Sequence, residues 1–138
     1  MAAAAAAEAV LSSIKPVSSL ASAASALTDE QLSILQFLCN KNLERAMRIL
    51  DLGGVERVVA EPSKRTVFRV LGESKGCDQY VCFPKHFCSC HSFFYDVVAR
   101  GEQLHCKHQL AARLSSALEL CKEVIVSDQQ LALMLLQI

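Results

Sequence analysis

The sequence lacks an excess of charge of either sign, because 14 basic residues balance 14 acidic residues among its 138. Proteins that bind nucleic acid strongly, or that attach to membranes through a polybasic segment, usually carry a clear positive excess. The sequence also lacks a run of about eighteen apolar residues, the length that a membrane-spanning helix requires. We therefore expect no membrane association, and direct nucleic-acid binding is disfavoured.

A secretory signal is not recognisable either, and the seven cysteines are an odd number. Both features argue against a secreted scaffold held together by disulfides. The Ala/Ser-rich start suggests an organelle transit peptide as an alternative, yet such peptides are usually rich in Arg and the first Arg here is Arg45. We instead expect a reducing compartment, cytosolic or nuclear, in which thiols are free to bind metal.

The length suits one domain with an appended arm, and an apolar content of 52% can support a core. In the arm, a low-complexity Ala run precedes apolar residues at helical spacing from Val10 onward, with a bend expected at Pro16. We predict four segments: an Ala/Ser-rich helical arm at 1–27, a helical segment at 28–54, a strand region with a cysteine-rich finger at 55–123 (finger core 77–115), and an apolar C-terminal helix at 124–138, a candidate partner-binding tail.

Helix signals flank the strand region. Thr28–Gln31 and Ser127–Gln130 have the spacing of a capping box and precede leucine-rich runs. The first run is expected to break near 40–42 and to end at Gly53 and Gly54. From about Lys107, HQLAARLSSALELCKEV has the spacing of an amphipathic helix. Its apolar face carries Leu110, Leu114, Leu118 and Cys121.

Between these helices the apolar spacing changes to the alternation typical of strands. VERVVA, TVFRVL and DQYVCF are β-branched or aromatic runs separated by turn residues. We predict a small antiparallel sheet of about three strands, at 55–60, 66–71 and 78–83. The predicted fold class is therefore α+β, with helices at both ends of the chain and the sheet in the middle.

The stretch from Cys88 to His108, CSCHSFFYDVVARGEQLHCKH, carries the main chemical signal. It has Cys-x-Cys at one end and Cys-x-His at the other, with fifteen residues between the pairs. Residues two apart share a face of an extended chain but point in different directions on a helix. Cys88 and Cys90 are therefore expected at a strand end or turn, and Cys106 and His108 where the chain enters the following helix.

Three thiolates and one imidazole form a soft, four-coordinate set that suits Zn²⁺ and leaves no position for a substrate water. We predict one structural Zn²⁺ ion, bound by Cys88, Cys90, Cys106 and His108. The sequence contains no phosphate-binding Gly-rich loop with Lys and Ser or Thr, so any ATPase activity would have to come from a partner.

The remaining cysteines and histidines have simpler interpretations. His91 and His105 adjoin the predicted ligands but fall outside the frame of the paired motif, and His86 is a loop residue without an assigned role. Cys82 is close enough in sequence to compete as a ligand, although its place in an apolar strand favours the core. Core positions are also predicted for Cys39 and Cys121, and a solvated turn for Cys77.

The paired motif resembles the SWIM zinc-finger pattern, Cys-x-Cys followed by Cys-x-His. The resemblance extends to Phe93 and to the run CKHQLAARL. Within this family the chain resembles the small SWIM subunits of Shu-type complexes, from about residue 8 onward, through DEQLSILQFL, YVCF and VSDQQL. The resemblance implies a finger of β-β-α type closed by zinc.

The resemblance also implies a nuclear, non-catalytic subunit, with the cytoplasm as a second location. Such a subunit pairs with a RecA-like recombinase paralogue and supports recombinase filaments in homologous recombination and DNA repair. Because the basic excess of the chain is weak, we expect any DNA affinity to belong mainly to the assembled complex. Two rival hypotheses stay open. One is direct DNA binding through the basic strand region, where seven basic residues face five acidic ones over 61–110. The other is a thiol enzyme, although its Cys–His dyad would lack a third orienting motif.

The C-terminal run LALMLLQI is apolar on nearly every side. It suits either a helix docked in the groove of a partner or a tail folded back on its own domain. The N-terminal arm poses the same choice, and the sequence leaves both alternatives open.

Overall fold

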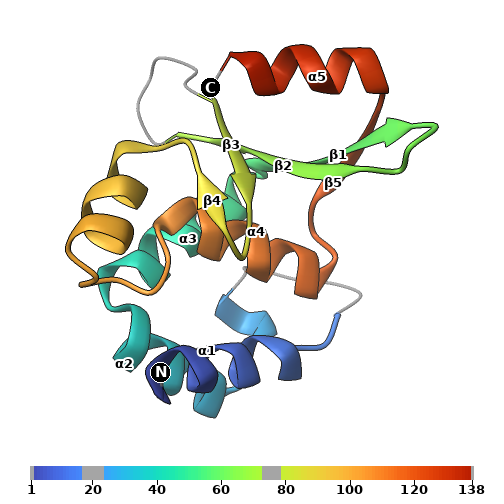
Figure 1. The fold of residues 1–138 in the computed structure, drawn as a ribbon. Helices are drawn as coiled ribbons and strands as arrows, with labels where there is room; N and C mark the ends of the chain where they lie inside the picture. Colours follow the sequence, from blue (N-terminus) through green and yellow to red (C-terminus); the bar gives the residue numbers. More distant parts are fainter. Residues whose placement is uncertain (1, 17–23, 73–78, 138) are drawn as a thin grey trace.

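A mixed sheet of five strands divides the molecule into layers in the computed structural model, which describes residues 2–16, 24–72 and 79–137 (Figure 1). Its strands are β1 (Val55–Glu61), β2 (Thr66–Leu71), β3 (Gln79–Phe83), β4 (Phe87–Cys88) and β5 (Lys122–Ser127). Their order across the sheet is β4-β3-β2-β1-β5. β5 runs parallel to β1, and the other neighbours are antiparallel.

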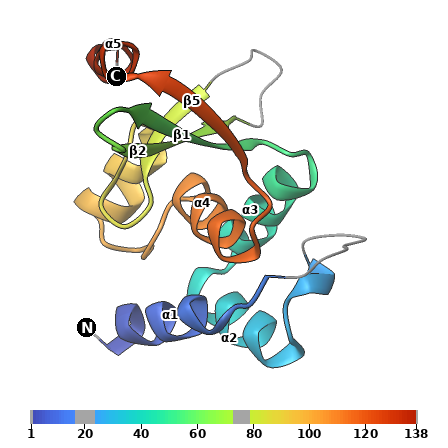
Figure 2. The same cartoon turned by 90° about the vertical axis from the view of Figure 1, so that its right-hand side faces the viewer.

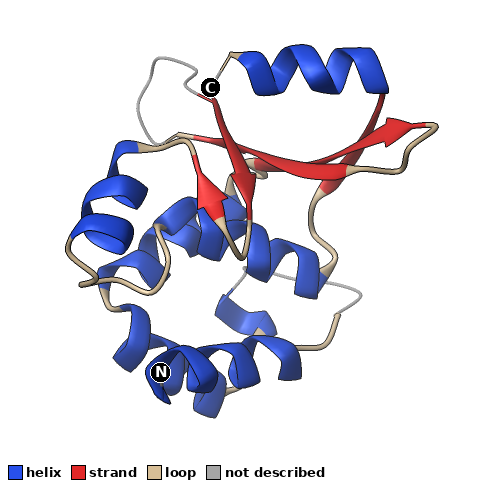
Figure 3. Ribbon diagram, viewed as in Figure 1, coloured by secondary structure: helices blue, strands red, loops and turns tan. Residues whose placement is uncertain are grey.

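Helices lie on both faces of this sheet. Two views at right angles show α5 (Asp128–Leu136) on one face, and α3 (Lys41–Asp51) and α4 (Lys107–Leu118) on the other (Figures 1 and 2). α1 (Ala2–Ser13) and α2 (Asp29–Cys39) form a further layer beyond them. A short 3₁₀ turn, η1 (Ala24–Ala26), precedes α2, and a π-helix, η2 (Phe93–Ala99), follows β4 (Figure 3). Within the described ranges, none of the helices combines the length and the apolarity needed to cross a bilayer.

The α+β class predicted from the sequence is confirmed, but the sheet is larger than predicted. The three expected strands are β1, β2 and β3, and the two-residue β4 extends the hairpin.

The prediction of a helix that continues through Val124 is wrong. α4 ends at Leu118, where Glu119 adopts a left-handed backbone with φ 57°. The residues from Lys122 to Ser127 instead form β5, because three consecutive β-branched residues favour an extended chain and pair with β1.

Local signals place the first helices as predicted. Thr28 caps α2: its hydroxyl accepts a hydrogen bond from the Gln31 amide, and the Gln31 side chain accepts one from the Thr28 amide. α2 and α3 are separated by Asn40 alone, at φ 53°. Gly53 follows the end of α3 and has a left-handed backbone, with φ +67°. A residue without Cβ adopts this backbone at little cost, which is why glycine suits this position.

Two apolar cores occupy opposite faces of the sheet. The larger core joins the sheet to α2, α3 and α4 and includes the fully buried Leu35, Leu43, Leu110 and Leu114. The smaller core lies between the sheet and α5 and contains Val58, Ala60, Val67, Val81 and Leu131. The C-terminal helix therefore packs on its own sheet through Leu131, which is 4% exposed. Leu133 and Leu136 on the same helix are 60% and 80% exposed.

The N-terminal arm forms a helix over the alanine run itself. The prediction of a low-complexity tail before the helix is wrong, because alanine has the highest helix propensity and α1 begins at Ala2. α1 contacts both α2 and α4 and buries Ala7 and Leu11. Residues 17–23, into which part of the predicted apolar stripe falls, lie outside the described residues.

An ion pair joins this arm to α4. Both carboxylate oxygens of Glu8 accept hydrogen bonds from Arg113, each at 2.8 Å, and the Lys85 ammonium lies 3.6 Å from Glu8. The hydrogen bond from Arg113 is the main reason why the pKa of Glu8 lies below its ordinary value. The ion pair therefore stabilises the fold at pH values above the range in which an ordinary glutamate carboxyl titrates. That contribution is lost as the pH falls through the lowered pKa.

We expect Glu8→Ala to loosen α1 from α4 and to leave the rest of the fold intact. The Glu8 side chain is 44% exposed, so solvent screening limits the loss to about 0.5–1 kcal/mol. Hydrogen–deuterium exchange at neutral pH should show faster exchange of the α1 amides and unchanged exchange in β1 and β2. Glu30→Ala, at an exposed carboxylate of α2, is the matched control. Equal effects of the two substitutions on α1 would contradict the role of the ion pair.

Candidate metal centre

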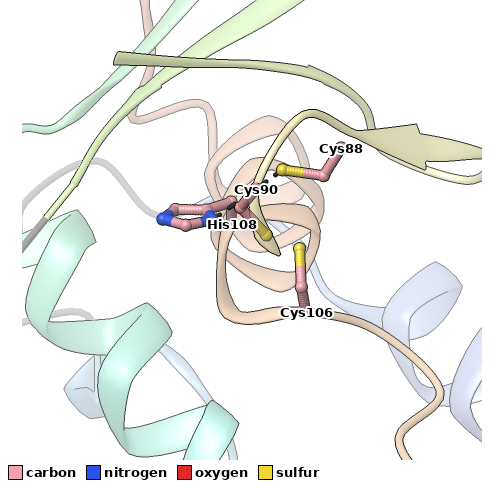
Figure 4. Close-up of side chains that lie close together, drawn as sticks. All are labelled: Cys88, Cys90, Cys106 and His108. Atoms are coloured by element: carbon pink, nitrogen blue, oxygen red, sulfur yellow. Dashed lines mark hydrogen bonds between the residues drawn. The ribbon is translucent and has the colours of Figure 1, made fainter. Parts of the chain in front are cut away.

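The four side chains predicted as zinc ligands come together in the structure. Cys88, Cys90, Cys106 and His108 each offer one ligand atom, and these atoms lie within 4.8 Å of one another (Figure 4). All four residues are at most 3% exposed. A tetrahedron with metal–sulfur bonds of about 2.3 Å has edges of about 3.8 Å, so the cluster has the right size for one four-coordinate ion.

The hairpin of β3 and β4 positions the first pair. Cys88 ends β4, opposite Cys82 of β3. The next residue, Ser89, fixes the bend after the strand: its amide donates to the Val81 carbonyl at 3.1 Å, and its hydroxyl accepts from the Val81 amide at 3.1 Å. Cys90 follows in this bend. The first pair thus lies at a strand end, as its spacing predicts.

Backbone amides donate to two of the sulfurs. Cys106 is the N-cap of α4, where its sulfur accepts from the Gln109 amide at 3.3 Å and its own amide donates to the Gln109 side chain at 3.1 Å. The Cys90 sulfur accepts from the amide of Phe93, the first residue of η2, at 3.3 Å. Amide donors at a helix N-terminus favour the thiolate, which is the form that binds metal.

His108 lies in the first turn of α4 with its ring buried. Its Nδ1 is 3.8 Å from the Cys88 sulfur and faces the cluster, which makes Nδ1 the candidate ligand atom (Figure 4). The Tyr80 ring packs against the imidazole, with ring centroids 4.3 Å apart. The other nitrogen, Nε2, has no hydrogen-bond partner among the described residues. Packing on Tyr80 therefore orients this ligand.

The three thiols cannot all ionise unaided. The pKa of Cys90 is lowered, first by its interaction with the Cys106 thiol and then by that with Cys88. The pKa of Cys106 is raised, first by its interaction with Cys88, then by that with Cys90 and by burial. A divalent ion would supply the positive charge needed to deprotonate the remaining thiols.

The arrangement can hold a metal ion with four protein ligands and leaves none of its tetrahedral positions open. Four protein ligands fill the four positions of a tetrahedral ion, and burial of all four side chains keeps solvent away. Catalytic metal sites need an open position for water or substrate. A metal ion bound here would therefore connect the β3–β4 hairpin to the start of α4 and stabilise their arrangement.

The other described cysteines lie outside the cluster. Cys82 and Cys39 are buried in the larger core, as predicted, and burial raises the pKa of Cys39 to about 11. Cys121 is half-buried and directly precedes β5, so its predicted place on a helix face is wrong. Cys77 falls outside the described residues.

The three remaining histidines are not in the cluster either. His86 and His91 are exposed, and His91 packs against Tyr95 with ring centroids 4.6 Å apart. His105 is half-buried, and desolvation lowers its pKa. The frame of the paired motif, which favours His108 over its neighbours, agrees with this placement.

Gln109 and Asn42 support the cluster and were missed by the sequence interpretation. Besides capping α4 with Cys106, Gln109 donates through Nε2 to the Pro84 carbonyl at 3.4 Å and so connects α4 to the hairpin. Asn42 on α3 donates to the His105 carbonyl at 3.0 Å. A signal for Gln109 exists in the sequence, because Cys106-x-x-Gln109 has capping-box spacing with Cys in place of Ser or Thr.

The sequences of several related proteins match most of the chain. The Danio rerio protein named Zinc finger SWIM domain-containing protein 7 is 40% identical over 106 residues, which cover 76% of this chain and 74% of that protein. The Homo sapiens protein of the same name is 35% identical over 111 residues, which cover 80% of this chain and 77% of that protein. The chain belongs to the Zinc finger SWIM domain-containing protein 7 family. The Mus musculus member is 36% identical over 112 residues.

Membership of this family identifies the chain as a SWIM zinc-finger protein, and the buried cluster of three cysteines and one histidine is the part of the fold that fits the name. The resemblance inferred from the Cys-x-Cys and Cys-x-His pairs is confirmed at this level. No family model matches the chain. No solved structure matches it either.

Proposed function

We propose that this chain is a non-catalytic subunit of a Shu-type complex, in which it pairs with a RecA-like recombinase paralogue. In that complex it promotes or stabilises recombinase filaments during homologous recombination and DNA double-strand break repair. The proposal places the chain in the nucleus, with the cytoplasm as a second location. It gives the chain one structural Zn²⁺ ion and no small-molecule substrate.

The ligand chemistry supports zinc as the ion. Three thiolates and one imidazole are a soft set, and Zn²⁺ accepts it in tetrahedral geometry without a redox change. Carboxylate oxygens, which Mg²⁺ and Ca²⁺ prefer, do not belong to the cluster of described ligand atoms.

The closed metal centre is the observation that carries the non-catalytic role. With no coordination position open to a substrate, the ion supports the shape of the finger, and function falls to the surfaces around it. Several large apolar side chains are exposed on η2, within the finger, and on α5, on the opposite face of the sheet. They are Phe94, Tyr95 and Val98 on η2, and Leu133 and Leu136 on α5. Exposed aromatic and aliphatic groups of this kind suit contact with a protein partner.

Charge pairing in the strand and finger region argues against direct DNA binding. Arg69 lies 2.8 Å from Glu56, Lys85 lies 3.6 Å from Glu8, and Lys64 is paired with Glu61. A cation already paired with a carboxylate gains less from a phosphate contact than a free one. We therefore assign DNA contact to the assembled complex rather than to this subunit alone.

Affinity purification of the tagged chain from its native cells, followed by mass spectrometry, tests the proposal. We expect a RecA-fold paralogue to co-purify with the wild-type chain and to be lost with His108→Ala, which removes a ligand and with it the shape of the finger. His86→Ala, at an exposed histidine outside the cluster, is the matched control and should retain the partner. A wild-type sample without such a paralogue would overturn the proposal, and salt-sensitive DNA binding by the isolated chain at physiological salt would favour the DNA-binding alternative.

A further inference from the structure

The outer edge of β5 has no partner strand among the described residues. β5 is the last strand of the sheet and pairs with β1 on one side. It is six residues long, whereas β4, at the opposite edge, has two residues. The outward N–H and C=O groups of an edge strand can bind another strand, and a longer edge offers more of them.

This edge has few of the features by which proteins block strand addition. Natural edge strands are usually short, bulged, or interrupted by proline or charge. β5 contains no proline, and its register with β1 is continuous from Lys122 to Ser127. Lys122 and Glu123 are its charged residues, and both lie at the start of the strand. Three β-branched residues and Ser127 make up the rest, and Ile125 among them is 56% exposed.

The side chains of β5 are complementary to a second copy of the same strand. In an antiparallel pair that sets Ile125 opposite Ile125, apolar residues face apolar residues, and no two charged residues of the same sign face each other. The facing positions within β5 are Val124 with Val126 and Glu123 with Ser127. Beyond them, Lys122 comes level with Asp128, the first residue of α5, in the other copy. Both hydrogen bonds that Asp128 accepts from Ser63 use Oδ1, so they do not engage Oδ2.

We propose that two copies of this chain pair through β5 and form one continuous sheet across a two-fold axis. Residue 125 lies on the axis, so the two Ile125 side chains contact each other on the face that they share with Val59 of β1. Each copy uses the same surface, which closes the assembly at a dimer. The paired segment, residues 123–127 of each copy, is a small interface, so the dimer is reversible and depends on concentration.

The oligomeric state of the full, zinc-loaded chain, purified without other proteins, tests this proposal. Sedimentation equilibrium from about 1 µM to about 1 mM spans the range of weak specific association. We expect the mass to rise from one chain to two for the wild type. Ile125→Lys should stay monomeric, because two ammonium groups would face each other across the axis. Val98→Lys, at an exposed β-branched residue of η2 that is 62% exposed, is the matched control and should dimerise.

A second variant tests the register and covers the case in which Ile125→Lys fails to fold. With oxidised glutathione as the oxidant, Ile125→Cys should form a disulfide between the two introduced thiols, identified by peptide mass mapping. Val98→Cys should form no such crosslink. A wild-type chain that stays monomeric over the whole range, or no crosslink at position 125, would overturn the proposal. The proposal would also be overturned if the wild type stayed monomeric and co-purified with another protein that Ile125→Lys no longer bound. In that case the β5 edge would be assigned to that protein.

Discussion

Cys90→Ala should release the metal ion and unfold the finger. The substitution leaves three ligands, and it also removes the sulfur that accepts a hydrogen bond from the Phe93 amide. A structural zinc ion contributes on the order of 10 kcal/mol to folding, which is comparable to the whole stability of a typical domain. We expect one zinc per wild-type chain by elemental analysis, much less than one in the variant, and loss of the cooperative thermal transition seen by circular dichroism. A strong chelator should have the same effect on the wild type.

Two matched comparisons make this prediction specific. Cys121→Ala changes a half-buried cysteine outside the cluster and should keep the full zinc content. His108→Ala should lose zinc, whereas His105→Ala should keep it, because His105 is not in the cluster. If Cys90→Ala retained both a full complement of zinc and the wild-type transition, the ligand assignment would be wrong.

Leu131→Ala should lower the free energy of unfolding by about 2–5 kcal/mol, the usual cost of truncating a buried leucine. Leu131 is 4% exposed and is the buried residue of α5 in the smaller core, which also contains Val58, Val67 and Val81. Urea unfolding of the zinc-loaded chain should show a lower midpoint with a similar slope. The zinc content should not change, because the smaller core lies on the other side of the sheet from α4.

Leu133→Ala, on the same helix, is the control for this prediction. Leu133 is 60% exposed, so its substitution should change stability by no more than about 0.5 kcal/mol. Equal effects of the two substitutions would show that α5 does not pack on the sheet in solution, as expected of a tail reserved for a partner.

The packing of α5 also decides how its contact with a partner can be studied. Removing every residue after Val126 would uncover the smaller core and would combine a folding defect with any loss of binding. Substitutions at Leu133 and Leu136, which leave that core intact, separate the two effects.

The sequence by itself determined the composition of the candidate metal centre and most of the local structure. Cys88, Cys90, Cys106 and His108 were predictable because residues two apart can converge only from a strand end or a helix entry, which is a local constraint. The capping boxes at Thr28 and Ser127 were predictable for the same reason, since each needs only four consecutive residues. The resemblance to the SWIM zinc-finger pattern followed from the same paired motif.

Only the tertiary structure decided how the C-terminal part of the chain is used. Spacing alone allowed Leu118 and the residues after it to continue a helix, whereas pairing with β1, more than sixty residues earlier, stabilises Lys122–Ser127 as a strand. The packing of α5 on the sheet likewise depends on Val58 and Val67, which are distant in sequence from Leu131. Pairings of this kind are invisible to periodicity, because periodicity reports which residues share a face and not what that face meets.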